Sequence, residues 1–227
     1  MPDDLASIKS DLQESAWVSA YQLHPIAWHS LQQRVCDRPD AWWAELKGLI
    51  EQAPAKLAGN LGMAPLKAIL ACQDDRVRTT VLAEARRERR LACAVAEVLT
   101  REQIFSQLGS DCVVSTYLRN QVDHDKFDFW AWEAIEETIS EDAETAWPLL
   151  LSLIDTAPDE ESRGLIGAGP LENFIMSNAD GFIERIEMAA RSRPRVKEAL
   201  ASVWIMTLRP DVFARIEAAA GVSLRRS

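Results

Sequence analysis

An internal repeat places the strongest limit on the fold of this chain of 227 residues. Four segments match others that lie 104 residues later: Ala27-Trp28 with Ala131-Trp132, Trp43 with Trp147, Leu49-Ile50 with Leu153-Ile154 and Ala53-Pro54 with Ala157-Pro158. After one inserted residue, two more match at an offset of 105: Pro65-Leu66 with Pro170-Leu171 and Asp75 with Asp180. Tryptophan and proline are rare residue types. Pairs of each in one frame therefore favour a duplicated unit of five helices over coincidence among alanine-rich helices.

Apolar residues recur at spacings of three and four along most of the chain, which is the period of an amphipathic α-helix. Phe182, Ile183 and Ile186 show this clearly. Period-two alternation is nearly absent, and only Cys112-Val113-Val114 has strand character. We therefore predict an all-α fold. The predicted helices span residues 4–14, 17–35, 40–52, 57–71, 75–98, 101–119, 127–140, 146–156, 159–167, 170–178, 180–192, 195–207 and 210–220.

The repeat and the helical period together predict two diverged five-helix units, stacked as a compact α-solenoid-like helical domain. We expect an N-terminal helical unit over 1–100, a packed helical joint over 101–126 and a C-terminal helical unit over 127–227. With two copies only, one compact helical domain is the alternative. Pro148 fits this scheme if Thr145 caps its helix and leaves the proline in the first turn; otherwise Pro148 kinks the helix.

A soluble, cytoplasmic protein is expected from the sequence. The residues after Met1 are acidic and lack the apolar region of a secretory signal. No run approaches the roughly 20 apolar residues of a membrane-spanning helix. The cysteines, which form no C-x-x-C pair, are Cys36, Cys72, Cys93 and Cys112. In the cytoplasm they are expected to be reduced, and the first three fall in helical apolar patterns.

The sequence predicts no catalytic residue, no cofactor and no metal site. His24 and His29 are five residues apart, which separates them on a helix. His124 stands among aspartates, where a metal site is the alternative to a helix cap or solvated joint. Gly167-Ala168-Gly169-Pro170 lacks the strand and spacing of a phosphate loop and favours close helix contact. Glu172 is expected to cap the following helix, with a functional contact as the alternative.

Charge is distributed unevenly along the chain, whose net charge is −10. Residues 121–161 contain thirteen acids and one base, Lys126, whereas residues 76–101 carry a net charge of +4. Nucleic acids and anionic membranes are disfavoured as partners, because both are polyanions. Two interpretations remain open: solvated faces that pair with each other, or a surface that steers a basic protein partner. The sequence does not decide whether the cluster Arg76–Arg101 or the acidic segment 123–161 is the binding face.

The candidate partner-binding residues combine acids of this segment with two tryptophans. They are Glu133, Glu136, Glu137, Glu141, Asp142, Glu144, Asp159, Glu160, Trp130 and Trp42. Most of the eight tryptophans are expected in the core. Trp42-Trp43 and Trp130-x-Trp132 cannot all face the core from one side of a helix. Trp42 and Trp130 are therefore predicted to be exposed, as anchors for a partner.

From about residue 129 to residue 217 the chain resembles an uncharacterised bacterial family of all-helical domains. The resemblance rests on Phe129-Trp130, on Ala168-Gly169-Pro170-Leu171-Glu172 (an A-G-P-L-E box), on Gly181-Phe182-Ile183-Glu184-Arg185 and on Val203-Trp204. Family members often carry His-Gly near Asn178-Ala179, and this chain departs there. The resemblance implies a helical bacterial domain and implies no activity. Small acidic helical proteins of this kind are frequent among the immunity partners of bacterial toxins, which is an analogy only.

Three functional hypotheses follow from the sequence. The first is a non-enzymatic protein-binding module, a candidate immunity protein that neutralises a basic toxin domain through its acidic surface. The second is a helical adaptor or scaffold with an aromatic groove between the repeats, around Trp42 or Trp130. The third is an enzyme of unrecognised type with a polar pocket near His124, His29 or Glu172. A homodimer is compatible with all three.

Overall fold

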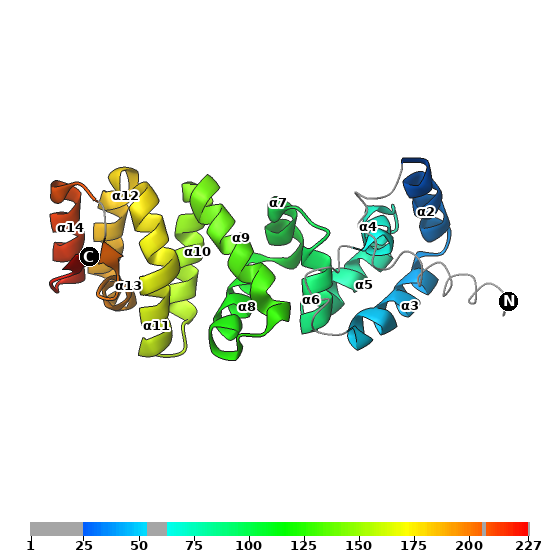
Figure 1. Ribbon diagram of the computed structural model, residues 1–227, viewed down its shortest axis with the longest axis horizontal. Helices are drawn as coiled ribbons and strands as arrows, with labels where there is room; N and C mark the ends of the chain where they lie inside the picture. The colour runs from blue at the N-terminus through cyan, green and yellow to red at the C-terminus, as the bar shows by residue number, and fades with distance from the viewer. Residues whose placement is uncertain (1–24, 54–62, 206–207, 227) are drawn as a thin grey trace. The chain divides into compact units, whose positions relative to one another are not determined.

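The computed structural model describes residues 25–53, 63–205 and 208–226, and Figure 1 draws them in colour. The predicted helix at 4–14 lies outside this range, as do the first residues of those predicted at 17–35 and 57–71. Within the described part, helices account for nearly all regular structure, and the all-α prediction is confirmed. The exception is one parallel pair of two-residue strands, β1 (Trp204–Ile205) and β2 (Arg225–Arg226).

Contacts within the chain divide it into two compact units. Unit 1 comprises residues up to Val113 together with His124–Trp130, and unit 2 comprises Val114–Asp123 together with the chain from Ala131 onward. The predicted division at residues 100 and 126 stays a prediction.

Unit 1 is built around α3, which packs against α4, α5 and α6. The elements of this unit are α2 (Pro25–Asp37), α3 (Pro39–Gln52), α4 (Ala64–Ala71), α5 (Asp75–Ala85), α6 (Arg89–Ala96), α7 (Arg101–Gln103), a π-helical turn (Ile104–Leu108) and a 3-10 turn (Lys126–Asp128). Prolines open α3 and α4 within their first two positions, where the missing N–H costs no hydrogen bond. Asp74 caps α5 by accepting from the backbone N–H groups of Arg76 and Val77.

Two long helices predicted in this region are broken. The helix predicted at 75–98 divides into α5 and α6, because every residue from Leu91 to Ala96 is buried and α6 must turn into the core. The helix predicted at 101–119 is interrupted at Gly109, whose φ of 92° is left-handed and open to glycine with little strain. α8 (Ser110–Asp123) begins after it and contains Cys112–Val114, so these residues do not form a strand.

Unit 2 is organised around the long helix α12, which packs against α13 and α14 (Figure 1). The elements of this unit are most of α8, then most of α9 (Phe129–Glu141), α10 (Ala143–Thr156), α11 (Glu160–Ile166), a π-helical turn (Gly167–Leu171), α12 (Glu172–Ser192), α13 (Pro194–Leu200), β1, α14 (Pro210–Ala220) and β2. The aromatic rings of Trp147, Phe174 and Phe182 meet in its core, with centroids 5.1 to 6.3 Å apart.

Three predictions of helix limits in unit 2 are wrong. The helices predicted at 170–178 and 180–192 form one helix, α12, and the Asn178 side chain donates to Phe174 O within it. The helix predicted at 195–207 ends at Leu200, before β1. Asp142 rather than Thr145 caps α10, which places Pro148 inside the helix. Pro148 lies on the exposed side, where water can satisfy the carbonyl group that loses its partner.

Helices in the two halves correspond closely in length and position. α2 and α9 each have 13 residues, α3 and α10 each have 14, and in both pairs the limits lie 104 residues apart. An arginine contact also recurs: Arg90 donates to Ala53 O at the end of α3, and Arg195 donates to Ala157 O at the end of α10. These correspondences agree with a duplicated unit, and the stacked arrangement stays a prediction.

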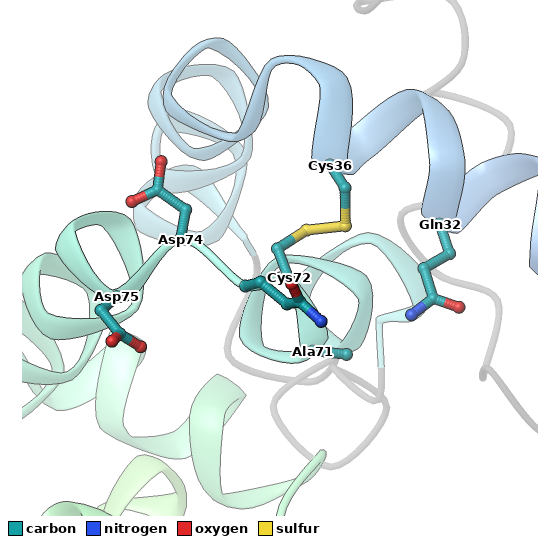
Figure 2. Close-up of a pocket in the computed structure, with 7 residues that line it drawn as sticks. Gln32, Cys36, Ala71, Cys72, Asp74 and Asp75 are labelled. Atoms are coloured by element: carbon teal, nitrogen blue, oxygen red, sulfur yellow. A yellow bond between two sulfur atoms is a disulfide. The ribbon is translucent and has the colours of Figure 1, made fainter.

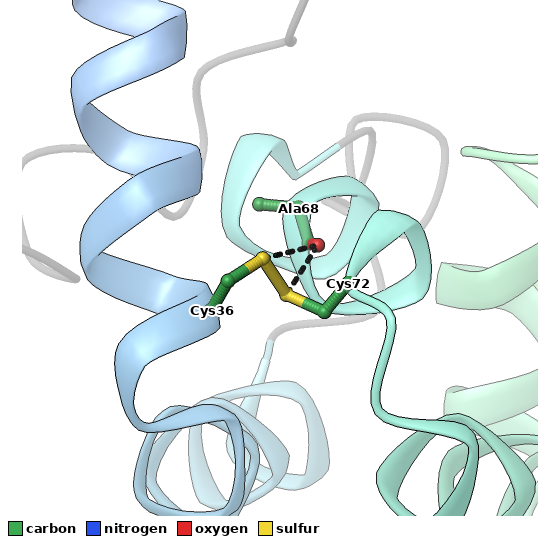
Figure 3. The surroundings of a disulfide bond; sticks show 3 residues. All are labelled: Cys36, Ala68 and Cys72. Atoms are coloured by element: carbon green, nitrogen blue, oxygen red, sulfur yellow. Dashed lines mark hydrogen bonds between the residues drawn. A yellow bond between two sulfur atoms is a disulfide. The ribbon is translucent and has the colours of Figure 1, made fainter.

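The expectation of reduced cysteines is wrong for one pair. Cys36 in the last turn of α2 and Cys72 directly after α4 form a disulfide, and Figure 3 shows the bond. Cys93 and Cys112 form no disulfide, as expected. The sequence did not reveal the pair, because the two cysteines are 36 residues apart and meet only when α2 packs on α4.

Candidate functional site

Three aspartates of the acidic segment 123–161 are helix caps. Asp125 accepts from Phe127 N at 3.0 Å, Asp142 from Thr145 N at 3.1 Å and Asp159 from Ser162 N at 2.8 Å. Bonds to the Ser162 hydroxyl and N–H lower the pKa of Asp159, and the bond from Phe127 N, together with Arg89, lowers that of Asp125. Asp142 and Asp159, both predicted to bind a partner, therefore have structural roles as well.

Other acids of the segment form ion pairs within their own unit. Arg89 lies 2.8 Å from Asp125 and 3.1 Å from Asp128, whose side chain is fully buried. Glu144, predicted to bind a partner, is paired with Arg185 at 2.7 Å. Asp155 is paired with Arg193, the residue that follows α12. The Arg89 contacts support the interpretation that acidic and basic segments partly pair with each other.

Most arginines of the Arg76–Arg101 cluster are engaged inside unit 1. Arg86 donates to Leu108 O at 3.0 Å and Arg76 pairs with Asp40. The Arg90 guanidinium stacks over the ring of Phe127 at 4.5 Å. These contacts join helices of the unit, so the cluster is much less available as a binding face than its charge suggests.

The candidate residues that have no structural role described above lie mainly on the exposed face of α9. Phe129 is 45% exposed and Trp132 is 37% exposed. Glu133, Glu137 and Glu141 follow at spacings of four, so that each adjoins the next along the helix, and all are exposed. α9 contains no lysine or arginine, and Glu141 stands at its C-terminal end, where the helix dipole disfavours negative charge.

Glu136 stands apart from these carboxylates, because it is half-buried at the edge of the α9 face. Its Oε2 accepts from the side chain of Asn173 at 2.8 Å. Burial raises the pKa of Glu136 despite this bond, because the charged form loses hydration. Burial, with the nearby charge of Glu136, also raises the pKa of Tyr117. Glu136 thus belongs partly to the packing of unit 2.

Both tryptophans predicted to be exposed are buried. Trp42 is 2% exposed and Trp130 is 5% exposed. Trp42 is covered because α3 has helices on several sides, including α4, α5 and α6. Trp130 belongs to a buried stripe of α9 with Ala134 and Ile135, which leaves Trp132 on the exposed side. The stripe was visible in the sequence, so the exposure of Trp132 could have been predicted from its position relative to it.

Gly167, directly before the A-G-P-L-E box, and Glu172, its last residue, have packing roles. A Cβ added to Gly167 would lie 2.1 Å from Ala199 O, so the glycine allows α11 to approach α13 closely. Glu172 does not cap α12 with its side chain; its Oε2 accepts from Trp204 N at 2.8 Å and holds β1. The interpretation of close helix contact at Gly167 is therefore confirmed, and the prediction that Glu172 caps its helix is wrong.

A polar pocket of about 620 Å³ opens beside the disulfide, and Figure 2 shows six of its residues as labelled sticks. It is lined by Gln32, Cys36, Ala71, Cys72, Gln73, Asp74 and Asp75. Neither His29 nor His124 lines it. Within the described residues, no group of three or more histidine, cysteine, aspartate or glutamate side chains is arranged to hold a metal ion. No helix in the described ranges has both the length and the apolar character needed to cross a membrane.

Comparison with known families gives one match. The model of a family of unknown function (DUF6869) matches residues 118–223, which include α9 to α14. The match fits the uncharacterised domain family that the sequence resembles, and the family's description names no activity. No curated protein and no solved structure matches the chain.

Proposed function

We propose that this chain is a non-enzymatic protein-binding module that docks a basic protein on the exposed face of α9. The observation that carries the proposal is the exposed side of α9 in unit 2, where Trp132 lies next to Glu133 and where Glu137 and Glu141 follow toward the C-terminal end, all of them exposed. A basic toxin domain is the partner of this class that we favour, with the chain as its immunity protein.

The chemistry of this side of α9 suits such a partner. An exposed tryptophan provides apolar area that gains stability when it is covered, and tryptophan is enriched among residues that dominate binding energy. Glu133, Glu137 and Glu141 stand at successive positions where like charges repel along a helix. A basic partner relieves this repulsion and is attracted over a distance by the net charge of −10.

The proposal narrows the surface predicted from sequence. Asp142 and Asp159 cap helices and Glu144 is paired with Arg185, so these acids have less charge to offer a partner. The adaptor hypothesis loses its named anchors, since Trp42 and Trp130 are buried. The proposal includes a cytoplasmic location for the protein and the A-G-P-L-E box as a sequence feature of its family.

The test is capture of partners from the native organism by the full-length chain, with matched variants. Glu133→Gln/Glu137→Gln removes two charges from α9, and Glu161→Gln/Glu184→Gln removes two exposed charges from α11 and α12, outside the candidate residues, as the control. We expect a captured protein with a basic domain whose affinity falls about ten-fold, and loses salt dependence, in the α9 variant alone. Trp132→Ala is expected to weaken binding at least as much.

The proposal is wrong if every captured protein binds the α9 variants and the control with equal affinity. It is equally contradicted if the binding proteins are acidic. Circular dichroism of each variant should match the parent chain, because Glu133, Glu137 and Trp132 are exposed and their replacement leaves the core intact.

A further inference from the structure

α2 is attached to unit 1 by much less apolar packing than its counterpart α9 has in unit 2. The two helices have the same length, 13 residues. α2 buries only Leu31 and Val35. The part of α9 in unit 2 buries five side chains: Ala131, Ala134, Ile135, Thr138 and Ile139. Since burial of apolar area is the main force that docks a helix, α2 needs another attachment.

That attachment is the Cys36–Cys72 disulfide. The bond joins the last turn of α2 to the residue after α4, the helix against which α2 packs. At the corresponding places of the second half, 104 and 105 residues later, the chain has Ser140 and Ser177, which cannot form such a bond. The first half therefore has a covalent link where the second half has a larger apolar contact.

The disulfide is placed where a small thiol can reach it. Both cysteines line the pocket of about 620 Å³, where Cys36 is half-buried and Cys72 is 4% exposed, so that Cys36 is the more accessible of the two; Figure 2 shows the bond between them. Attack on a disulfide requires such access, because the incoming thiolate must approach one sulfur directly. A structural disulfide enclosed in a core lacks this access.

The surroundings also suit the reduced form. The carbonyl oxygen of Ala68 lies 3.1 Å from Cys72 Sγ and 4.0 Å from Cys36 Sγ (Figure 3), so it can accept a hydrogen bond from a thiol after reduction.

We propose that Cys36–Cys72 is a reversible thiol–disulfide exchange site whose reduction releases α2 from α4. The reductant is a dithiol. Its thiolate attacks one sulfur and forms a mixed disulfide, and its second thiol then closes the reductant's own disulfide. Two electrons and two protons pass to the chain, the Cys36–Cys72 bond breaks and two thiols form. An oxidised dithiol reverses the reaction.

The test is hydrogen exchange with mass spectrometry on the full chain, before and after treatment with dithiothreitol. We expect the amides of α2 to exchange at least ten times faster after reduction, while those of α3 and α5 keep their protection. Cys36→Ser/Cys72→Ser is expected to show fast exchange in α2 that dithiothreitol does not change. Reoxidation with oxidised dithiothreitol should restore slow exchange in the wild-type chain.

Three results would overturn the proposal. In the first, α2 keeps its protection after alkylation has shown that both thiols are free. In the second, α2 to α6 lose protection together, which makes the bond a general support of unit 1. In the third, Cys36 and Cys72 of the untreated chain are alkylated without reductant and do not pair in oxidised dithiothreitol.

Discussion

Substitution of Gly167 by alanine should destabilise unit 2, because the glycine lies against the backbone of α13. The added Cβ would stand 2.1 Å from Ala199 O and 3.0 Å from the carbonyl carbon of the same residue. Ala199 O also accepts from Ser202 N, so its displacement disturbs the turn that ends α13. Contact with backbone cannot be relieved by a change of rotamer, and α11 and α13 must separate.

The size of the effect follows from two opposing contributions. Overpacking of this kind costs about 3 kcal/mol, at the upper end for one added methyl group. Gly167 has φ −60° and ψ −53°, so alanine adopts its conformation and recovers about 1 kcal/mol of helix propensity. We therefore expect a net loss of about 2 kcal/mol. Gly181→Ala in α12 is the matched control, since no atom lies within 4 Å of its added Cβ, and it should gain about 1 kcal/mol.

The measurement is urea unfolding, followed by hydrogen exchange of peptides from α11 to α13, so that the free energy of unfolding is assigned to unit 2. Far-ultraviolet circular dichroism at zero urea checks that both variants fold. If Gly167→Ala proves as stable as Gly181→Ala, the close approach of α11 to α13 does not exist in solution and the argument fails.

Three further predictions concern single carboxylates. Arg89→Ala should destabilise unit 1 by about 3 kcal/mol in urea unfolding, because it removes an ion partner of buried Asp128, and Asp128→Asn in the same chain should recover part of the loss. The pKa of Glu136 is raised, so the folded chain holds the proton of this carboxyl group more firmly than the unfolded chain does. The contribution of Glu136 to stability therefore falls as the pH rises through its pKa in the folded chain. Glu136→Gln should abolish this fall, measured as the melting temperature over the same pH range. Glu172→Ala should speed amide exchange at Trp204 about ten-fold, whereas Glu172→Gln should preserve much of the protection.

The fold class could be predicted because it depends on local periodicity. Spacings of three and four give helices wherever one face meets a core, and the predicted limits 40–52 and 210–220 nearly match α3 and α14. The breaks between successive helices were harder to predict from the sequence. Residues 91–96 of α6 are all buried, and the division of α6 from α5 depends on where the core lies.

The partner-binding site stays a prediction, and the structure corrects the expected exposure of its two tryptophans, Trp42 and Trp130. Asp142 and Asp159 were predicted to bind a partner, and the structure shows that they cap α10 and α11. Trp132 was overlooked, although its spacing from the stripe of Trp130 and Ala134 places it on the opposite side. The disulfide depends on contact between α2 and α4, which no local pattern encodes.

The acidic segment shows why a net charge does not measure a binding surface. Its aspartates largely cap helices or pair with arginines: Asp125, Asp128, Asp142, Asp155 and Asp159. A charge with such a role is already compensated by N–H groups or a guanidinium, and a partner gains less from it than from a solvated one. On the exposed face of α9, Glu133 adjoins Trp132, and the helix contains no lysine or arginine. The combination of apolar area with negative charge, rather than the number of acids, is what makes this face the better candidate for binding.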